Sequence, residues 1–200
     1  MRKIEFFAIL SLLAFCAPAF AGWQEHASPF DAQRLAKLDE SRTKGLDEAS
    51  AASAADLAII DSVLHAQAVD ASAAALQGNW RCRTIKLGGM TPDVIYGWFR
   101  CRVSLKDGEP YFEKLSGSQR TSGFLYPEGG GFVYLGASYV AGHGPSEKPH
   151  AYPGNGAGAG AEATPDDQIG LLSLLSDGRA RLELPCPVQE STFDVIELKR

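Results

Sequence analysis

The sequence predicts an α+β protein in which a helical N-terminal segment of two helices precedes an antiparallel, up-and-down β-barrel of about eight strands. Three observations predict this arrangement. Apolar residues recur at helical spacing as far as residue 77, β-branched and aromatic residues alternate with polar ones from residue 78 onward, and short turn motifs separate the alternating runs. Short connections join antiparallel neighbours, and a meander of this length closes into a barrel. A β-sandwich is the main alternative.

The 200-residue chain has the composition of a globular protein, with 45% hydrophobic and 22% charged residues. This size fits one domain with a small appendage. The formal net charge is −5, so the chain lacks the excess of basic residues through which proteins bind nucleic acid or anionic lipid. The charge therefore predicts no nucleic-acid partner.

The first 21 residues have the pattern of a secretory signal peptide. Arg2 and Lys3 precede an apolar core at residues 6–15, and a small-x-small cleavage motif ends at Ala21. We expect cleavage after Ala21 and a periplasmic or secreted mature protein. The apolar core is shorter than the roughly 20 residues of a spanning helix, so no membrane span is expected.

The helical segment, residues 22–77, begins at a capping motif. Ser28 precedes Pro29, which suits the first position of a helix, and the periodicity predicts a helix over residues 29–49. Ser53 starts a second, shorter helix that ends near residue 65, and the Ala-rich stretch after it is expected to add one more turn.

The barrel domain, residues 78–200, contains eight predicted strands. Asp107-Gly108 and Asp177-Gly178 mark tight turns between them. Residues 142–165 are rich in Gly, Ala and Pro and predict a flexible surface loop. The predicted strands cover residues 78–87, 94–105, 110–116, 119–126, 131–140, 168–176, 179–185 and 191–199.

Alternation gives the first two predicted strands an inward and an outward face. Trp80, Cys82 and Thr84 share the inward face of the first strand, and Cys101 lies on that of the second. A register in which paired residue numbers sum to about 183 sets Cys82 opposite Cys101, which predicts a disulfide and leaves Cys186 as a free thiol. Two buried free thiols are the alternative. The inward face of the second strand is predicted to consist of Ile95, Gly97, Phe99, Cys101, Val103 and Leu105.

The same register brings four arginines together on the outward face, a repulsive arrangement unless acidic side chains are near. Two interpretations remain open, a structural ion network, which the sequence favours, and an anion-binding stripe. The carboxylates of the network would come from Glu113 and, after barrel closure, from Asp194 and Glu197. The predicted pairs are Arg81 with Arg102 and Arg83 with Arg100.

No catalytic or metal-binding motif is recognisable. His26, His65, His143 and His150 lack metal-ligand spacing, and none of the common hydrolase motifs occurs. The sequence therefore predicts neither a metal nor another cofactor, and it leaves catalysis undecided with a leaning against it. The polar turn around Arg120 could cradle an oxyanion, although a solvated hairpin connection is the favoured explanation.

Gly78-Asn79-Trp80 resembles the Gly-x-Trp motif that opens the first strand of lipocalins and related calycins. It too follows a helical turn and begins a run of about eight strands. The resemblance implies that Trp80 closes one end of the barrel, stacked under an arginine such as Arg181. Exported bacterial metalloprotease inhibitors of the small-barrel type look similar at this point, which adds protein binding as a second class of function.

A longer resemblance covers most of the mature chain. It rests on Gly78-Asn79-Trp80-Arg81-Cys82-Arg83 with Lys86-Leu87-Gly88-Gly89, on Tyr96-Gly97-Trp98-Phe99-Arg100-Cys101, and on residues 114–123 and 190–198. These blocks are similar to the proteobacterial domain-of-unknown-function family 4893, which has no assigned activity to carry over.

Together these observations favour a non-catalytic periplasmic binding module for a small apolar or amphipathic ligand, because a small closed barrel either fills with side chains or holds one small molecule. The candidate ligand-binding residues are Trp80, Thr84, Phe99 and Arg120. The alternatives are a protein-binding module, such as a periplasmic protease inhibitor, and an envelope structural protein.

Overall fold

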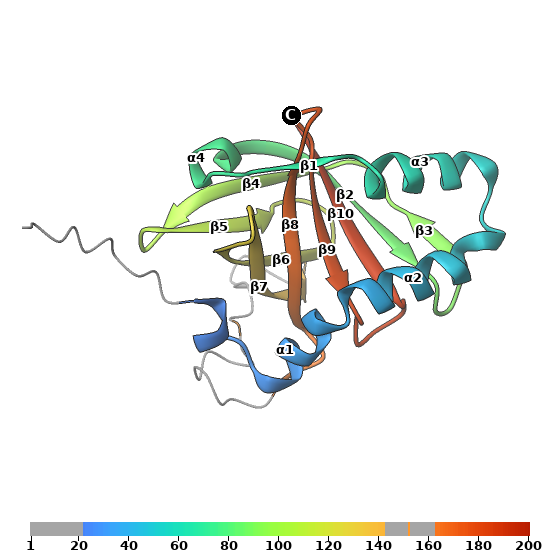
Figure 1. Cartoon of the computed structure of the whole chain (residues 1–200), viewed down its shortest axis with the longest axis horizontal. Helices are drawn as coiled ribbons and strands as arrows, with labels where there is room; N and C mark the ends of the chain where they lie inside the picture. The colour runs from blue at the N-terminus through green and yellow to red at the C-terminus, as the bar shows by residue number, and fades with distance from the viewer. Residues whose placement is uncertain (1–21, 143–151, 153–162) are drawn as a thin grey trace, which may run out of the picture.

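A computed structural model shows a closed barrel of antiparallel strands with helices along one side and at one end (Figure 1). The structure describes residues 22–142, 152 and 163–200. The predicted signal peptide and most of the predicted loop at 142–165 therefore lie outside the described residues.

Eight strands follow one another around the barrel in chain order, and the ladders β8–β9, β9–β10 and β10–β2 close it. This is the up-and-down order that the short turns predict. Two short strands extend the sheet, β1 (Ala68–Val69) beside β8 and β3 (Asp93–Ile95) beside β2. The barrel strands are β2 (Gly78–Leu87), β4 (Phe99–Lys106), β5 (Glu109–Lys114), β6 (Gln119–Glu128), β7 (Gly131–Val140), β8 (Asp167–Leu175), β9 (Ala180–Pro185) and β10 (Phe193–Lys199).

A bulge splits the strand predicted over residues 94–105. Ile85 of β2 pairs with Ile95 of β3, whereas Cys82 pairs with Phe99 of β4, so residues 96–98 oppose only two β2 residues. The bulge turns Ile95 outward, toward the helices, and its predicted inward position is wrong. Leu105 was also expected inside and is 54% exposed, because the β4–β5 hairpin extends beyond the barrel (Figure 1).

Cys82 and Cys101 form a disulfide, with their Cα atoms 5.9 Å apart, as the inward faces of their strands predict. The register behind that prediction is wrong by two residues, because Trp80 lies opposite Cys101. The bridge is therefore diagonal across the β2–β4 ladder. Cys186 is a free thiol.

One end of the barrel is closed by α4 (Ala73–Leu76) and Trp80. Trp80 Nε1 donates a hydrogen bond of 2.8 Å to the Leu76 carbonyl, and the guanidinium of Arg200 lies 4.6 Å from the indole centroid. Arg200 also donates to the Ala75 carbonyl at 2.6 Å, so it fastens α4 over the indole. Trp80 thus lies where the Gly-x-Trp resemblance implies, with Arg200 rather than Arg181 as the stacked arginine.

Apolar side chains fill the barrel next to this closed end. They include the inward residues of every barrel strand, so this half of the interior has the close packing of an ordinary core. The largest members are Trp80, Phe112, Phe132 and Tyr134, with Leu125, Leu172, Leu182 and Leu198 among the others.

The helix predicted over residues 29–49 is broken at Lys37 into α1 (Pro29–Ala36) and α2 (Leu38–Glu48). The break lets the chain follow the curved barrel, with α1 against β8 and β9, and α2 against β9, β10 and β2 (Figure 1). Gly45 makes the α2 contact possible, because a Cβ there would lie 2.7 Å from Phe193 Cβ. No helix of the described residues is both long and apolar enough to cross a membrane.

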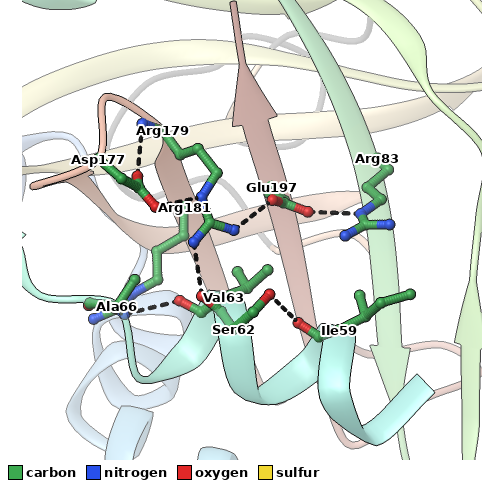
Figure 2. Close-up of polar contacts among 9 residues, drawn as sticks. All are labelled: Ile59, Ser62, Val63, Ala66, Arg83, Asp177, Arg179, Arg181 and Glu197. Atoms are coloured by element: carbon green, nitrogen blue, oxygen red, sulfur yellow. Dashed lines mark hydrogen bonds and ion pairs between the residues drawn. The ribbon is translucent and has the colours of Figure 1, made fainter. Parts of the chain in front are cut away.

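Two arginines, Arg179 just before β9 and Arg181 within it, hold the C-terminal end of α3 (Ala54–Leu64), as Figure 2 shows. Arg181 donates hydrogen bonds of 2.7–3.1 Å to three backbone carbonyls at this end, and Arg179 donates to a fourth at 2.8 Å. Carbonyls at a helix C-terminus lack partners inside the helix, so the arginines satisfy them. The carbonyls that accept from Arg181 are those of Val63, Leu64 and Ala66, and the carbonyl that accepts from Arg179 is that of Ser62.

Replacing both bridge cysteines by alanine should lower the free energy of unfolding by about 3 kcal/mol, because the disulfide closes a loop between residues separated by 19 positions. Chemical denaturation under non-reducing conditions measures the loss. Cys186→Ser is the matched control and should leave the bridge intact. A non-reducing peptide map that joined Cys186 to either partner would contradict the assignment.

Candidate functional site

The end of the barrel opposite Trp80 holds a pocket of about 150 Å³, here called the mouth pocket. A cavity of this volume can hold a molecule the size of benzene. Apolar, polar and charged side chains all line the pocket. The apolar wall consists of Val140, Pro165, Leu184, Pro187, Val188 and Ile196. The charged lining residues are Arg34, Lys86, Lys114, Arg120, Asp166, Asp167, Glu190 and Asp194.

Lys86 and Asp194 face each other at the seam where β2 and β10 close the barrel. Lys86 Nζ lies 2.6 Å from a Glu190 oxygen and 3.9 Å from an Asp194 oxygen. Burial opposes the charge on Lys86, but Asp194 and Glu190 outweigh that effect and raise its pKa. Burial raises the pKa of Asp194 to about 6, although Lys86 and the Ser191 hydroxyl, which donates at 2.6 Å, favour the carboxylate.

Lys114 is the last residue of β5 and follows the inward Phe112 by two positions, so it also points into the barrel. It is 6% exposed and lines the mouth pocket. Its Nζ lies 4.5 Å from the centroid of the Phe99 ring, and within the described residues it has no hydrogen bond or ion pair. Burial, helped by the positive charge of Lys86, lowers the pKa of Lys114 to about 8.

A polar layer separates the mouth pocket from the apolar half of the barrel. Thr121 Oγ1 lies 2.5 Å from the hydroxyl of Tyr134 and 2.5 Å from Oε1 of Gln168. Burial raises the pKa of Tyr134, so this phenol stays protonated and acts as a hydrogen-bonding group. The layer gives the pocket a polar floor above the filled core.

The structure brings two of the four predicted ligand-binding residues to the pocket. Thr84 and Arg120 line it, and Arg120 Nε donates to the Gly117 carbonyl at 3.0 Å. Phe99 lies beneath Lys114 rather than in the lining, and Trp80 lies at the closed end. Ligand binding by these residues stays a prediction.

Sequence reasoning missed the interior positions of Lys86 and Lys114. Its assignment of Asp194 to the outer arginine network is wrong, because Asp194 pairs with Lys86 and lines the pocket. The alternation that places Trp80, Cys82 and Thr84 inside also places Lys86 inside, and the same parity extends from Phe112 to Lys114. The signal was present, but a lysine in a strand is ordinarily assigned to the solvent face.

The four predicted outward arginines, here called the basic stripe, lie on the outer face of the barrel, away from the pocket. They are Arg81, Arg83, Arg100 and Arg102. The predicted pairs of the stripe are wrong, because Arg81 faces Arg100 and Arg102 faces Asn79. The predicted network is present for two members: Arg83 bonds Glu197 at 2.6 Å and Arg102 bonds Glu113 at 2.8 Å. The Trp98 indole contacts two cations on this face. Lys199 Nζ lies 4.0 Å and the Arg83 guanidinium 4.7 Å from the centroid of the indole ring.

No group of three or more His, Cys, Asp or Glu side chains suited to a metal ion occurs in the part of the chain that the structure describes. His143 and His150 lie outside that part.

Comparison with known proteins gives one match. A family model described as a domain of unknown function, DUF4893, covers residues 23–198. Searches of curated proteins and of solved structures found no match.

Replacing Lys114 by methionine should raise the free energy of unfolding at pH 7 by up to about 3 kcal/mol, because folding moves its pKa from 10.5 to about 8. The folded state binds the proton more weakly, so the penalty is complete below pH 8 and disappears as the pH rises through 10.5. Denaturation of both proteins at pH 7 and pH 10.5 tests this, and the gain should vanish at the higher pH. Lys114→Arg, which keeps a buried charge, should show no gain. A methionine variant less stable than wild type at pH 7 would contradict the prediction.

Proposed function

This chain belongs to the DUF4893 family, whose description assigns no function. From the geometry of the mouth pocket, we propose that the protein is a non-catalytic binding protein that holds a small amphipathic anion there. The observation that carries the proposal is Lys114, a buried cation that faces the pocket without a carboxylate partner in the described residues.

The other charged groups of the pocket already have polar partners in the described residues, and Arg120, which is half-buried, donates to the Gly117 carbonyl. Lys86 is paired with Glu190 and Asp194, and Arg34 is paired with the buried Asp31. Among the acids, Asp166 accepts a hydrogen bond from Ser138, and Asp167 accepts one from the Thr164 backbone. An unpaired buried charge is costly, and an anion in the pocket would relieve that cost at Lys114.

The apolar wall supports an amphipathic ligand over a purely charged one. Leu184 and Ile196 face the same space as Lys114. A long apolar ligand is disfavoured, because side chains fill the half of the barrel below the polar floor. A compound with one anionic group and a short apolar part matches the volume and the lining.

We also propose that the mature protein is periplasmic or secreted, as the charged, apolar and small-x-small order of residues 1–21 suggests. The disulfide supports this proposal, since such bonds persist in oxidising compartments.

The protein-binding alternative has less support. Recognition would then lie in exposed segments such as residues 27–52 or the loop at 142–165, most of which lies outside the described residues. In the first segment, α1 and α2 pack against the barrel through Leu35, Leu38 and Leu46. Their apolar side chains contribute to the fold, which leaves few of them for a partner.

Small carboxylates with an apolar part, such as benzoate or hexanoate, should bind the mature protein at one site by isothermal titration calorimetry. The matched neutral compound benzyl alcohol should bind at least about tenfold more weakly, because it cannot form a charge-assisted hydrogen bond. Lys114→Met should lose a similar factor for benzoate.

Lys199→Met is the control variant for this titration, because Lys199 is a cation on the outer face. It should bind benzoate as the wild type does. Equal binding of benzoate and benzyl alcohol, or equal loss in the two variants, would remove the support for the mouth pocket.

Export should produce a mature protein that begins at Gly22. Mass spectrometry of the protein purified from a periplasmic fraction measures this directly. A chain that keeps Met1, or one that begins with a lipidated Cys16, would contradict the proposed cleavage after Ala21.

A further inference from the structure

Lys114 differs chemically from the other lysine of the same pocket. Lys86 has two carboxylates within 3.9 Å, which hold it as an ammonium ion. Lys114 has the Phe99 ring on one side and the pocket on the other, and no carboxylate partner among the described residues. A lysine that is desolvated and close to another cation is the arrangement that makes an amine nucleophilic.

The surroundings of Lys114 also fix its position. Cys101, opposite it in the β4–β5 ladder, is held by the disulfide to Cys82. Phe99 packs against Gly117, where a Cβ would lie only 2.9 Å from the ring. The amine therefore projects from a rigid wall into a space that a small molecule can enter.

One kind of ligand uses both properties of this residue. The proposed function requires an anionic group beside Lys114, and a nucleophilic amine requires an electrophilic carbon at the same place. A carbonyl group directly attached to a carboxylate supplies both within a few atoms, and such a compound fits a pocket of about 150 Å³.

We propose that Lys114 captures a small 2-oxo acid as a reversible imine in the mouth pocket. This inference rests on the proposed function, since the carboxylate of the ligand occupies the anion position described above.

The chemistry is balanced without a co-reactant. The neutral amine of Lys114 attacks the carbonyl carbon, so a C–N bond forms as the π bond of the carbonyl breaks. One proton passes from the nitrogen to the carbonyl oxygen, which gives a neutral carbinolamine. Loss of that oxygen as water then forms the C=N bond, and hydrolysis reverses both steps. Asp194 lines the same pocket, and its pKa of about 6 suits it to exchange protons near neutral pH.

The pKa of about 8 supports this reactivity. At pH 7 it makes the free-amine fraction about 300-fold larger than a pKa of 10.5 would. A protonated imine keeps the positive charge, so the carboxylate retains its partner after the bond has formed.

The test uses pyruvate with borohydride reduction, which converts an imine into a stable secondary amine. We expect one reduced adduct per molecule of mature protein by intact mass, located at Lys114 by peptide mapping. Lys114→Met should lose this adduct, whereas Lys199→Met should keep it. The labelling rate should rise with pH with a midpoint near pH 8, since the neutral amine reacts.

Lactate separates the two proposals, because it has the carboxylate of pyruvate and a hydroxyl in place of the ketone. It should give no adduct with borohydride and should reduce labelling by pyruvate in proportion to its occupancy. Carboxylate binding that depends on Lys114, together with pyruvate adducts spread over surface lysines, would overturn the imine and leave the anion site standing. Labelling of Lys114 that lactate and benzoate do not reduce would support a reactive amine but overturn its assignment to 2-oxo acids.

Discussion

The ladder between the first and last barrel strands is the interaction on which the rest of the molecule depends. It closes the barrel and aligns Lys86 with Asp194 at the mouth. The buried Glu197 of β10 forms ion pairs with Arg83 of β2 and with Arg179. Arg179 also donates a hydrogen bond to the C-terminal end of α3. A buried carboxylate is favourable only when it is fully paired, so closure, helix docking and assembly of the mouth are energetically linked.

The two ends of the barrel show opposite solutions to burial. At the closed end Trp80 donates to the Leu76 carbonyl, Arg200 donates to the Ala75 carbonyl, and the apolar core is continuous. At the mouth an ammonium group is desolvated without a counter-charge in the described residues. The neighbouring pocket cations Lys86 and Arg34 are each paired with a carboxylate, so Lys114 is a local conflict of the kind that occurs at functional sites.

Strand order and most strand limits were predictable, because the turn motifs and the alternation are local properties of the chain. β2 and β7 have the predicted bounds. The register of β2 with β4 was not predictable, since the bulge at residues 96–98 depends on how β2 is shared between β3 and β4. The break at Lys37 follows from the curvature of the barrel, which no local pattern records. Of the residues that line the mouth pocket, Thr84 and Arg120 were among those named from the sequence, and their ligand binding stays a prediction. The lysines were not foreseen, because an inward lysine contradicts the binary pattern by which strand faces are assigned.

The seam of the barrel has a consequence for the order in which the chain folds. Arg83 and Glu197 are 114 positions apart, whereas the other ladders between barrel strands join strands that follow one another in chain order around the barrel. Hairpins of the meander can therefore form early, but β2 and β9 remain open edges until β10, the last strand, pairs with both. Topologies with distant pairings fold slowly, and open edges are the places where chains associate wrongly. Arg200, which follows β10 and fastens α4 over Trp80, can take its place only after that step, so the risk of aggregation persists until β10 has paired and this end of the barrel is closed.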